Sequence, residues 1–372
     1  MMKRRTFLQT AGILGVSSLS GLGAAALESV LRAQPAQDVV VDPLRALFER
    51  SLVIDALSLG HQWDLTEYEA LAKTGYSGFQ ATLLNRNTLE GALGELNTWQ
   101  RRIAEHPEKF RLATRADDFL SAKQNGQVAV LLGFQDCVMI GKNVDNLDVL
   151  HELGTRCLQL TYNYRNFLGN GCLERVDGGL SDFGIEAVTR MNELGILVDL
   201  SHCGPQTSLD GIAFSNLPAA FTHTMCESIY RDHPRAKTDE QIRAMAEKGG
   251  MTGITMIGYF VGPDPGGETT IENYINHIDH AVNIAGIDHV GMSSDFAIRG
   301  ISPWATKETW YEPRLEVFKP SYKVRWPPWI PELDMPERFW NVTQALSRRG
   351  YSEDDIEKLL GANWVNLFSQ VF

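Results

Sequence analysis

The chain has 372 residues, of which 44% are hydrophobic, and its formal net charge is −12. This length and composition suffice for one large α/β barrel with insertions, or for two average domains. The acidic balance argues against a nucleic-acid-binding protein, because phosphate contacts need clustered Lys and Arg, and no such cluster follows the first five residues.

The N-terminal residues are typical of an export signal. Lys3-Arg4-Arg5-Thr6-Phe7-Leu8 is a twin-arginine pattern, and a weakly apolar, Gly- and Ala-rich stretch follows over residues 10–27. Serines and glycines interrupt this stretch, which disfavours a membrane-spanning helix. We therefore predict a signal over residues 1–37 that is recognised by the twin-arginine export machinery, and a mature protein in the periplasm. This route exports folded proteins, with or without a cofactor.

Beyond the signal, short apolar runs alternate with helical stretches such as residues 182–195, which start with an acidic residue and end at Gly. Each run is apolar on both faces, as is typical of strands that helices cover. Eight such units predict a single (β/α)8 TIM-like barrel over residues 38–372. An open doubly wound sheet is the rival, but no Gly-rich phosphate loop follows the first run. The runs cover residues 52–55, 79–84, 128–134, 157–161, 196–200, 219–222, 251–256 and 289–292.

Residues 299–336 follow the eighth run, carry four Trp and repeated Pro, and lack helical periodicity. A long irregular segment in a compact domain is usually a functional lid or a partner surface. After an eighth barrel strand it would overhang the mouth as a lid, or it would strap the outer helices. Both interpretations stay open. A capped helix over residues 352–361 and a last helix that reaches Phe372 end the chain.

The five cysteines are an odd number and show no paired spacing. A chain of this size does not need a disulfide framework. We expect separate buried thiols, with one disulfide in the oxidising compartment as the alternative. The cysteines are Cys137, Cys157, Cys172, Cys203 and Cys226.

Polar residues stand at the ends of several predicted strands. Because reactive groups of such barrels gather where the strands end, these residues are the first candidates for a site. His202 and His223 follow consecutive strands, and two neutral imidazoles could hold one edge of a tetrahedral zinc site. Asp295 could be a ligand, a proton carrier or an orienting group. The full set is Asp55, Asn85, Gln135, Tyr162, His202, His223 and Asp295.

Five segments in this order and spacing resemble the renal or membrane dipeptidase family, and the resemblance extends over the mature chain through Asn363. They are residues 199–202, 221–224, 233–239, 248–251 and 286–296. The resemblance implies a metal-dependent hydrolase on a (β/α)8 barrel. Members of the family cleave dipeptides with two zinc ions that a carboxylate and a hydroxide bridge.

The resemblance also implies roles for individual residues. It makes His202 and His223 ligands of one metal and Arg235 a clamp for the substrate carboxylate, for which a bidentate guanidinium is well suited. It places Asp295 where the family handles the proton. Tyr162 stands where the family has a histidine that helps to bind the substrate or its transition state, and we assign Tyr162 to catalysis and, together with Asn163, to substrate binding.

Three departures from the family pattern affect the metal site. The first strand of the family normally ends in Asp-x-His-x-Asp, but Leu57 and Leu59 occupy the two ligand positions after Asp55. The bridging glutamate is replaced by Gln135, a neutral donor. His61 and Asp64 lie two to five residues beyond the expected positions.

Leucine offers no lone pair, so a two-metal centre is not expected. We predict at most one zinc on His202 and His223, with Gln135 or Asp136 and water completing an open site, and an absence of metal stays an alternative. His277 and His280 lie in a predicted helix between the seventh and eighth strands, where we expect surface or packing roles.

These observations predict a divergent bacterial member of the family that hydrolyses a dipeptide or a related small amide. Two alternatives stay open. One is a non-hydrolytic acid–base enzyme, an isomerase or lyase, that acts on a small carboxylated molecule. The other is a catalytically silent binding protein. The resemblance further allows a homodimer with lid contacts across it.

Overall fold

The computed structural model describes residues 42–60, 63–84, 87–262 and 268–372. Residues Pro43–Phe372 form one compact unit, and the architecture below is that of this unit. The predicted export signal, residues 1–37, lies outside the described residues. In the described part of the chain, no helix is long and apolar enough to cross a membrane.

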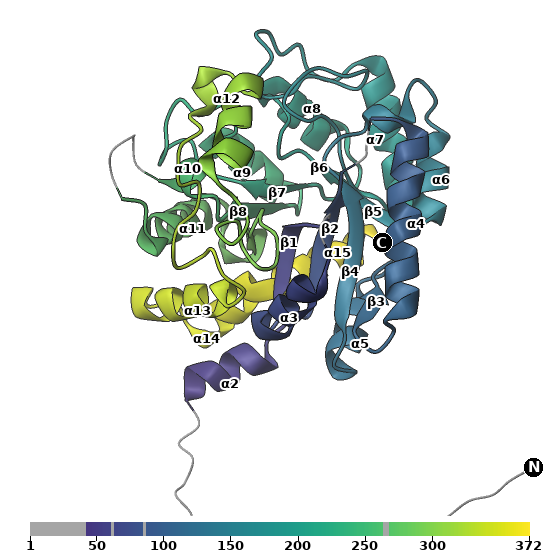
Figure 1. Cartoon of the computed structure of the whole chain (residues 1–372). Coiled ribbons are helices and arrows are strands. Elements are labelled where there is room, and N and C mark those ends of the chain that lie inside the picture. The colour runs from purple at the N-terminus through teal and green to yellow at the C-terminus, as the bar shows by residue number, and fades with distance from the viewer. Residues whose placement is uncertain (1–41, 61–62, 85–86, 263–267) are drawn as a thin grey trace, which may run out of the picture. The chain divides into compact units, whose positions relative to one another are not determined.

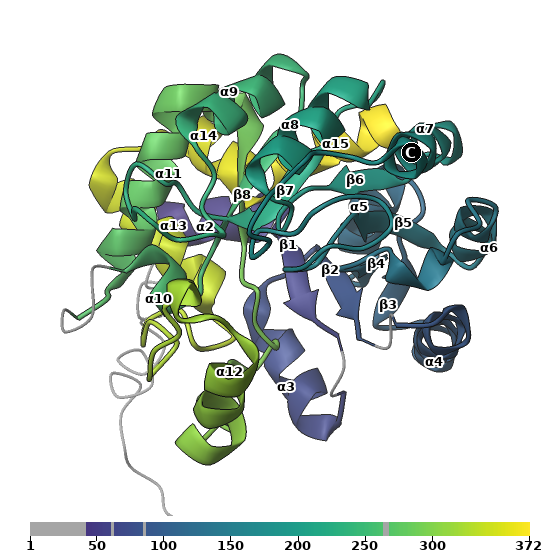
Figure 2. The same ribbon diagram turned by 90° about the horizontal axis from the view of Figure 1, so that it is seen from above.

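Eight parallel strands form the central barrel, each paired with the next in chain order except that β2 pairs directly with β4 (Figures 1 and 2). The short β3 (Phe110–Leu112) pairs with β4 beside the ring, and the sequence analysis did not predict it. The predicted single (β/α)8 barrel is therefore confirmed. The barrel strands are β1 (Ile54–Leu59), β2 (Gly78–Leu83), β4 (Val128–Phe134), β5 (Thr155–Gln159), β6 (Leu197–Asp199), β7 (Ala220–Thr224), β8 (Met251–Thr255) and β9 (Val290–Ser293).

The seam between the last and the first strand closes the ring. The Asp295 amide donates to the Leu57 carbonyl and the Leu59 amide to the Phe296 carbonyl, both at 2.9 Å. The buried Asp55 carboxylate reinforces the seam, because it accepts from the Ser294 amide at 2.7 Å and from the Ser294 hydroxyl at 2.5 Å. Asp55 therefore lies inside β1 and not at its end as predicted.

Helices surround the strands and follow the expected capping chemistry. Ser181 accepts from the Gly184 amide at the start of α7 (Asp182–Leu194), and Gly195 ends that helix in the left-handed conformation. The other helices before residue 299 are α2 (Pro43–Arg50), α3 (Leu65–Thr74), α4 (Leu89–Glu105), α5 (Asp117–Gln124), α6 (Asn146–Glu152), α8 (Pro205–Phe214), α9 (Asp239–Glu247), α10 (Gly258–Val261) and α11 (Ile271–Ala285).

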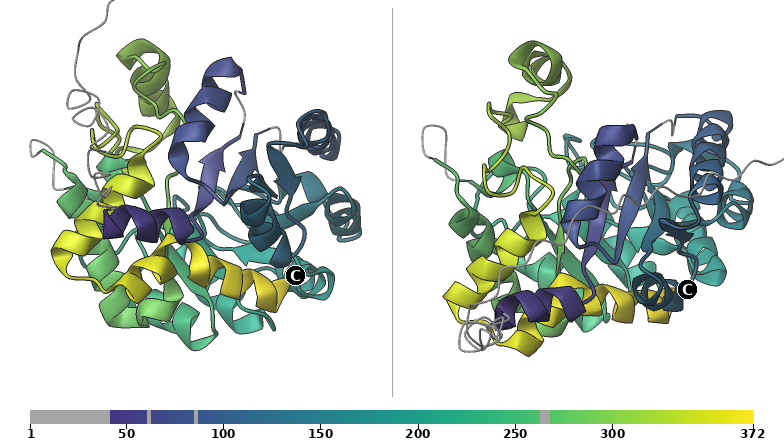
Figure 3. Two further views of the ribbon diagram at one scale, coloured as in Figure 1. Left: turned by 90° about the horizontal axis from the view of Figure 1, so that it is seen from below. Right: turned by 60° about the horizontal axis from the view of Figure 1, so that its bottom comes forward.

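Alternate strand residues separate two apolar layers. On β4, Val130 and Leu132 belong to the large cluster between strands and helices, whereas Ala129 and Leu131 belong to a smaller cluster with α15 (Asn363–Val371). Trp364 of α15 is fully buried. Seen from below, α15 runs across this end of the barrel (Figure 3). With the amino ends of the strands filled in this way, the carboxyl ends are left for the site.

Residues 299–336 are more ordered than their sequence pattern indicates. They contain a π-helical turn over Lys307–Tyr311, the helix α12 (Glu312–Val317) and a 3₁₀ turn over Pro320–Tyr322. The Asp334 carboxylate accepts from the amides of Ile301 and Ser302, so it ties the two ends of the segment together. In Figure 1, α12 lies at the end of the barrel opposite to α2, α13 (Arg338–Arg349) and α14 (Glu353–Glu357).

All five cysteines are free, and four of them are buried, while Cys172 is partly exposed. The expectation of separate thiols is therefore confirmed.

Candidate active site

A cavity of about 120 Å³ lies at the carboxyl ends of the strands. Its walls combine polar groups from the barrel with aromatic side chains. Five of the lining residues come from the segment 299–336, which therefore covers the mouth of the barrel. The lining residues are Leu59, Gln135, Tyr162, His202, Ile257, Tyr259, Phe260, Asp295, Ile301, Trp310, Arg314, Phe318 and Tyr322.

The structure brings most of the predicted site residues together. Gln135, Tyr162, His202 and Asp295 share the cavity wall, although they follow four different strands. His223 lies directly behind them, because its Nε2 is 3.0 Å from His202 Nε2. Asn85 and His61 lie outside the described residues.

The hydrogen bonds of the two histidines define which nitrogen carries the proton. Asn163 Oδ1 lies 2.8 Å from His202 Nδ1 and also accepts from Cys172 Sγ and Tyr322 Oη, so the network assigns it as an acceptor. His202 therefore donates through Nδ1 and keeps a lone pair on Nε2. Asn163, which was predicted to bind substrate, lies fully buried behind His202 and outside the cavity lining.

His223 is held in the same way from the other side. Thr222 Oγ1 donates to the Asp199 carboxylate at 2.7 Å and lies 2.8 Å from His223 Nδ1. A hydroxyl has one proton, so His223 must donate from Nδ1 and present a lone pair on Nε2. Burial and the charges of Arg235 and Lys237 hold the pKa of His223 well below its usual value, which keeps the imidazole neutral.

Thr222 and Asp199 were not predicted as site residues, although both lie within three residues of a candidate histidine. A polar residue that directly precedes a strand-borne histidine was the available signal, because ligating imidazoles are commonly oriented by such partners.

Gln135 completes the cluster. Its side-chain Nε2 lies 3.1 Å from His223 Nε2, and its backbone carbonyl accepts from Gln159 Nε2 at 2.6 Å. An amide can rotate to present either its nitrogen or its oxygen, so Gln135 can donate to the His223 lone pair or direct an oxygen donor at the same point.

Tyr162 packs on the cavity side of His202. The two rings are stacked, with centroids 4.2 Å apart and an interplanar angle of 22°. The stack fixes the orientation of the His202 ring, as the hydrogen bond from Nδ1 to Asn163 also does.

Asp295 has unusual backbone and proton chemistry. Its φ of 56° is in the left-handed region, which a residue with a side chain adopts only when its surroundings enforce it. Here the bond from its amide to the Leu57 carbonyl enforces it. Burial and the charge of Asp55 raise the pKa of Asp295 to about 7, while the charges of Arg235 and Arg314 and a bond from Thr255 oppose that shift. A carboxyl with a pKa near 7 can both accept and donate a proton at neutral pH.

Arg235 is fully buried and binds the backbone on both sides of the histidine pair. Its Nη1 donates to the Ser201 carbonyl, and its Nη2 donates to the His223 carbonyl at 2.7 Å. It is not among the residues that line the cavity. Its role as a clamp for the substrate carboxylate stays a prediction.

The loop after β5 folds back onto the site. The Cys172 amide donates to the His202 carbonyl, and the Leu173 amide donates to the Asn163 carbonyl. A Cβ at Gly171 would lie 2.2 Å from the Tyr162 carbonyl oxygen, so only glycine permits this approach. The glycines of this loop therefore help to shape the pocket.

The described residues offer donors for one metal ion. Both Nε2 lone pairs are directed at one region and lie 3.0 Å apart, which is unfavourable unless an electrophile lies between them. That spacing suits two ligands of one zinc, given Zn–N distances of about 2.0–2.1 Å. Leu59 supplies only carbon to the cavity and Leu57 is fully buried, so neither of these two described residues could hold a second ion. Among the described residues, no group of three or more His, Cys, Asp or Glu could hold a metal.

Other candidates lie apart from the cavity. Asp64 caps α3 by accepting from the Glu67 amide and pairs with Arg299. His277 accepts from the Cys226 amide, while His280 pairs with Asp239. The packing and surface roles expected for these two histidines are confirmed.

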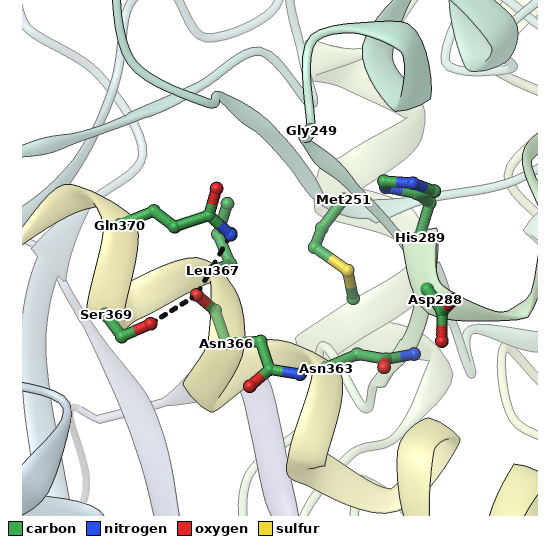
Figure 4. A pocket seen from close by; sticks show the side chains of 9 residues that line it. All are labelled: Gly249, Met251, Asp288, His289, Asn363, Asn366, Leu367, Ser369 and Gln370. Atoms are coloured by element: carbon green, nitrogen blue, oxygen red, sulfur yellow. Dashed lines mark hydrogen bonds between the residues drawn. The ribbon is translucent and has the colours of Figure 1, made fainter.

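A second, larger cavity of about 350 Å³ lies at the amino end of the barrel. Asn366, Ser369 and Gln370 of α15 lie on one side of it, and Met251 and His289 lie on the other (Figure 4). The Ser369 and Gln370 side chains are bonded to their own helix, and the His289 imidazole is bonded to the Gly250 carbonyl. Among the described residues that line this cavity, His289 is the only histidine, so a pair like His202 and His223 is absent there.

Residues 69–307, more than half of the chain, match the family described as membrane dipeptidase (peptidase family M19). The chain belongs to this family. The match includes the histidine pair and Asp295, and it confirms the resemblance found in the sequence.

Two curated relatives are 26% and 29% identical to this chain over the aligned residues. The dipeptidase tcpJ of Claviceps purpurea (strain 20.1) is 26% identical over 279 residues, which cover 74% of this chain and 59% of the relative. An uncharacterised dipeptidase of Schizosaccharomyces pombe is 29% identical over 220 residues, which cover 58% of this chain and 52% of that protein. The chain thus spans just over half the length of these relatives.

Solved structures match over most of the chain. The crystal structure of an amidohydrolase from Pseudomonas aeruginosa has a TM-score of 0.79 and 28% identity, and it covers 88% of this chain and 98% of its own. The similarity in fold thus extends beyond the residues that the family match covers. That this particular chain is bacterial stays a prediction.

Proposed function

We propose that the protein is a hydrolase that cleaves a dipeptide or a related small amide with one zinc ion held by His202, His223 and Gln135. Family membership supports the reaction class. The observation that carries the proposal is the pair of imidazoles whose Nδ1 atoms are both engaged by acceptors and whose Nε2 atoms converge at 3.0 Å. Zinc at that point would supply Lewis acidity that polarises an amide carbonyl and acidifies a water molecule.

The protein's own groups have separable tasks in this proposal. Asn163 and the Thr222–Asp199 pair fix the tautomer and the orientation of the two imidazoles. Asp295 accepts a proton from the attacking water and returns it to the leaving amine, for which a pKa of about 7 is suited. The aromatic walls exclude bulk water, and Tyr162 holds the His202 ring in place.

A metal-free acid–base enzyme is the second candidate. The hydrogen-bonded chain from Asp199 through Thr222 to His223 favours it, because such a chain also serves a catalytic imidazole. The substrate would then be a small carboxylated molecule and the reaction an isomerisation or elimination. A silent binding protein would use the same cavity without turnover.

Hydrolysis of free dipeptides is the direct test. Purified wild-type protein is assayed by amine release from a panel of free dipeptides, beside His202→Ala and the surface variant His106→Ala. We expect turnover that is lost in His202→Ala and unchanged in His106→Ala, whose imidazole lies 38% exposed on the outer surface. Turnover that survives His202→Ala would contradict the proposal. Turnover that needs Asp295 but no metal, on a carboxylated non-peptide, would favour the second candidate.

We also propose that the protein is exported to the periplasm through the twin-arginine route and is a homodimer. The pattern over residues 3–8 supports export. The dimer rests on the analogy with the family that the sequence resembles. Cell fractionation of wild type and an Arg4→Lys, Arg5→Lys variant tests the first point. Wild type is expected in the periplasm and the variant inside the cell, and an equal distribution would contradict the route. A mass from light scattering that equals one chain would contradict the dimer.

A further inference from the structure

One positively charged side chain in the cavity wall comes from residues 299–336, the covering segment over the mouth of the barrel. Arg314 lies on α12 and is the only Lys or Arg among the described residues that line the cavity. Arg235, the other arginine of the site, lies beneath the wall with its terminal nitrogens bonded to backbone carbonyls. The positively charged side chain that a molecule in the cavity would meet is therefore Arg314.

The Arg314 guanidinium is held in place. Its Cζ lies 3.9 Å from the centroid of the Trp310 ring, and its Nη1 donates to the Trp310 carbonyl at 2.8 Å. Stacking on an indole orients the plane of a guanidinium and lowers the entropy lost on binding. The group is thus preorganised as a planar fork.

Among the described residues, no carboxylate forms an ion pair with this guanidinium. In the described part of the chain, the hydrogen bond to Trp310 is its only one, and no carboxylate comes within 4 Å of it. An arginine has five N–H donors, so most of them stay available. Partial burial of a cation is costly unless an anion pairs with it, and the cavity is where such an anion would enter.

The covering segment is anchored to the site, so the position of Arg314 relative to the barrel is set. Tyr322 is buried, its ring stacks on Phe318 at 4.5 Å, and its carbonyl is 2.9 Å from His233 Nε2. Lys319 Nζ donates to the Leu173 carbonyl in the loop that also holds His202. These bonds place α12 over the cavity and not away from it.

We propose that Arg314 binds the carboxylate of the substrate, so that the protein selects molecules with a free carboxyl group, such as dipeptides with an unmodified C-terminus. The inference rests on the proposed function and adds the group that sets specificity. Arg314 and Asp295 both line the cavity yet form no ion pair within 4 Å. A carboxylate at Arg314 therefore leaves room for the amide to lie toward His202 and Asp295.

Binding of two matched probes tests this inference without relying on turnover. The probes are a phosphinate mimic of L-Ala-D-Ala and the same compound with its carboxylate converted to a carboxamide. Calorimetry gives Kd for each probe with wild type, Arg314→Gln, Arg314→Lys and Lys307→Gln. Lys307→Gln is the matched control, because it removes one positive charge from an exposed position of the same segment.

We expect wild type and Lys307→Gln to bind the carboxylate probe about 10- to 100-fold more tightly than the carboxamide, the range of a charge-assisted hydrogen bond. Arg314→Gln is expected to bind both probes equally, and Arg314→Lys to retain part of the preference. Equal binding of both probes by wild type, or binding of neither, would overturn the inference. A preference that survives Arg314→Gln but is lost in Arg235→Lys would overturn it as well and assign the carboxylate to Arg235.

The two proposals fail in different ways. A protein that prefers the carboxylate probe through Arg314 but releases no amine from dipeptides keeps this inference and loses the hydrolase. A dipeptidase without an Arg314-dependent preference keeps the hydrolase and loses this inference.

Discussion

The two halves of the cavity floor differ in what their strand ends contribute. On β6 and β7, His202 and His223 each have an oriented polar partner at Nδ1, so their Nε2 atoms face the same region. On β1, Leu57 and Leu59 contribute carbon only, and Asp55 turns to the seam with Ser294. The strand ends of β6 and β7 therefore provide the groups that could bind a metal, whereas β1 provides the contacts that close the barrel. Changes in the two halves should therefore affect different measurements.

The largest effect is expected at Asp295, which lies between the two halves. Asp295→Asn removes the proton carrier, so kcat/KM should fall about 10²- to 10⁴-fold. In wild type, kcat/KM should fall as the pH drops below about 7, because the carboxylate form accepts the proton. Burial and Asp55 raise this pKa, while Arg235, Arg314 and a hydrogen bond from Thr255 oppose the shift. A pH profile of Asp295→Asn that retains the wild-type inflection would contradict this assignment.

Loss of the seam carboxylate should affect stability and not metal binding. Asp55→Ala leaves the Ser294 amide, the Ser294 hydroxyl and the Tyr76 hydroxyl without their acceptor, so the free energy of unfolding should fall by about 3 kcal/mol. Asp64→Ala is the control, because loss of that helix cap should cost only about 1 kcal/mol. Urea unfolding measures both. Equal losses would show that Asp55 does not hold the seam.

Loss of Asn163, the hydrogen-bond partner of His202, should affect metal binding. Asn163→Ala removes the acceptor at Nδ1, so zinc affinity should fall about 10- to 100-fold. Competition with a chelator measures this affinity. Cys172→Ala is the control, since it removes a thiol that donates to the same Asn163 oxygen but leaves the acceptor of His202 in place. An unchanged affinity in Asn163→Ala would remove the basis for treating Asn163 as the orienting group.

A gain in zinc affinity is expected at Gln135, the neutral donor beside the two histidines. Gln135→Glu replaces the neutral amide, whose Nε2 lies 3.1 Å from His223 Nε2, with a carboxylate. An anionic donor should raise zinc affinity by about tenfold. Gln159→Glu is a matched change one strand away, and it should not raise the affinity. The proposal that Gln135 contacts the ion fails if the two variants bind zinc equally.

The last expected effect is on stability, and it also arises at Asp295. A carboxyl whose pKa is raised to about 7 in the folded protein holds a proton that the unfolded chain releases above its ordinary pKa of 3.8. The folded state thus loses stability between about pH 4 and pH 7 and does not regain it at higher pH. Because one pKa unit corresponds to about 1.4 kcal/mol, Asp295→Asn should raise the free energy of unfolding by up to about 4 kcal/mol at pH 8 and not at pH 4. An equal change at both pH values would contradict the raised pKa.

Prediction from sequence succeeded where a feature depends on local pattern. The apolar run over residues 128–134 is β4 without a change of bounds, because a buried parallel strand is apolar throughout. His202 and His223 meet because strand ends converge in a barrel. The first predicted strand, residues 52–55, ends four residues before the observed β1, which continues through Ala56 to Leu59.

Other features depend on contacts that no local pattern encodes. Arg314 reaches the cavity because Asp334 and Tyr322 fix a segment whose sequence has no periodicity. Asn163 follows β5 beside Tyr162, yet only the loop around Gly171 turns it behind His202. The left-handed Asp295 backbone likewise follows from its bond across the seam to Leu57.

The number of zinc ions per chain tests the contrast between the two halves most directly. Protein purified from its native compartment and dialysed against metal-free buffer is analysed by plasma mass spectrometry, with His202→Ala as the control. One zinc per wild-type chain, absent in His202→Ala, is the expected result. Two ions per chain would contradict the closure role of Leu57, Leu59 and Asp55, and no ion in wild type would contradict the single-zinc site.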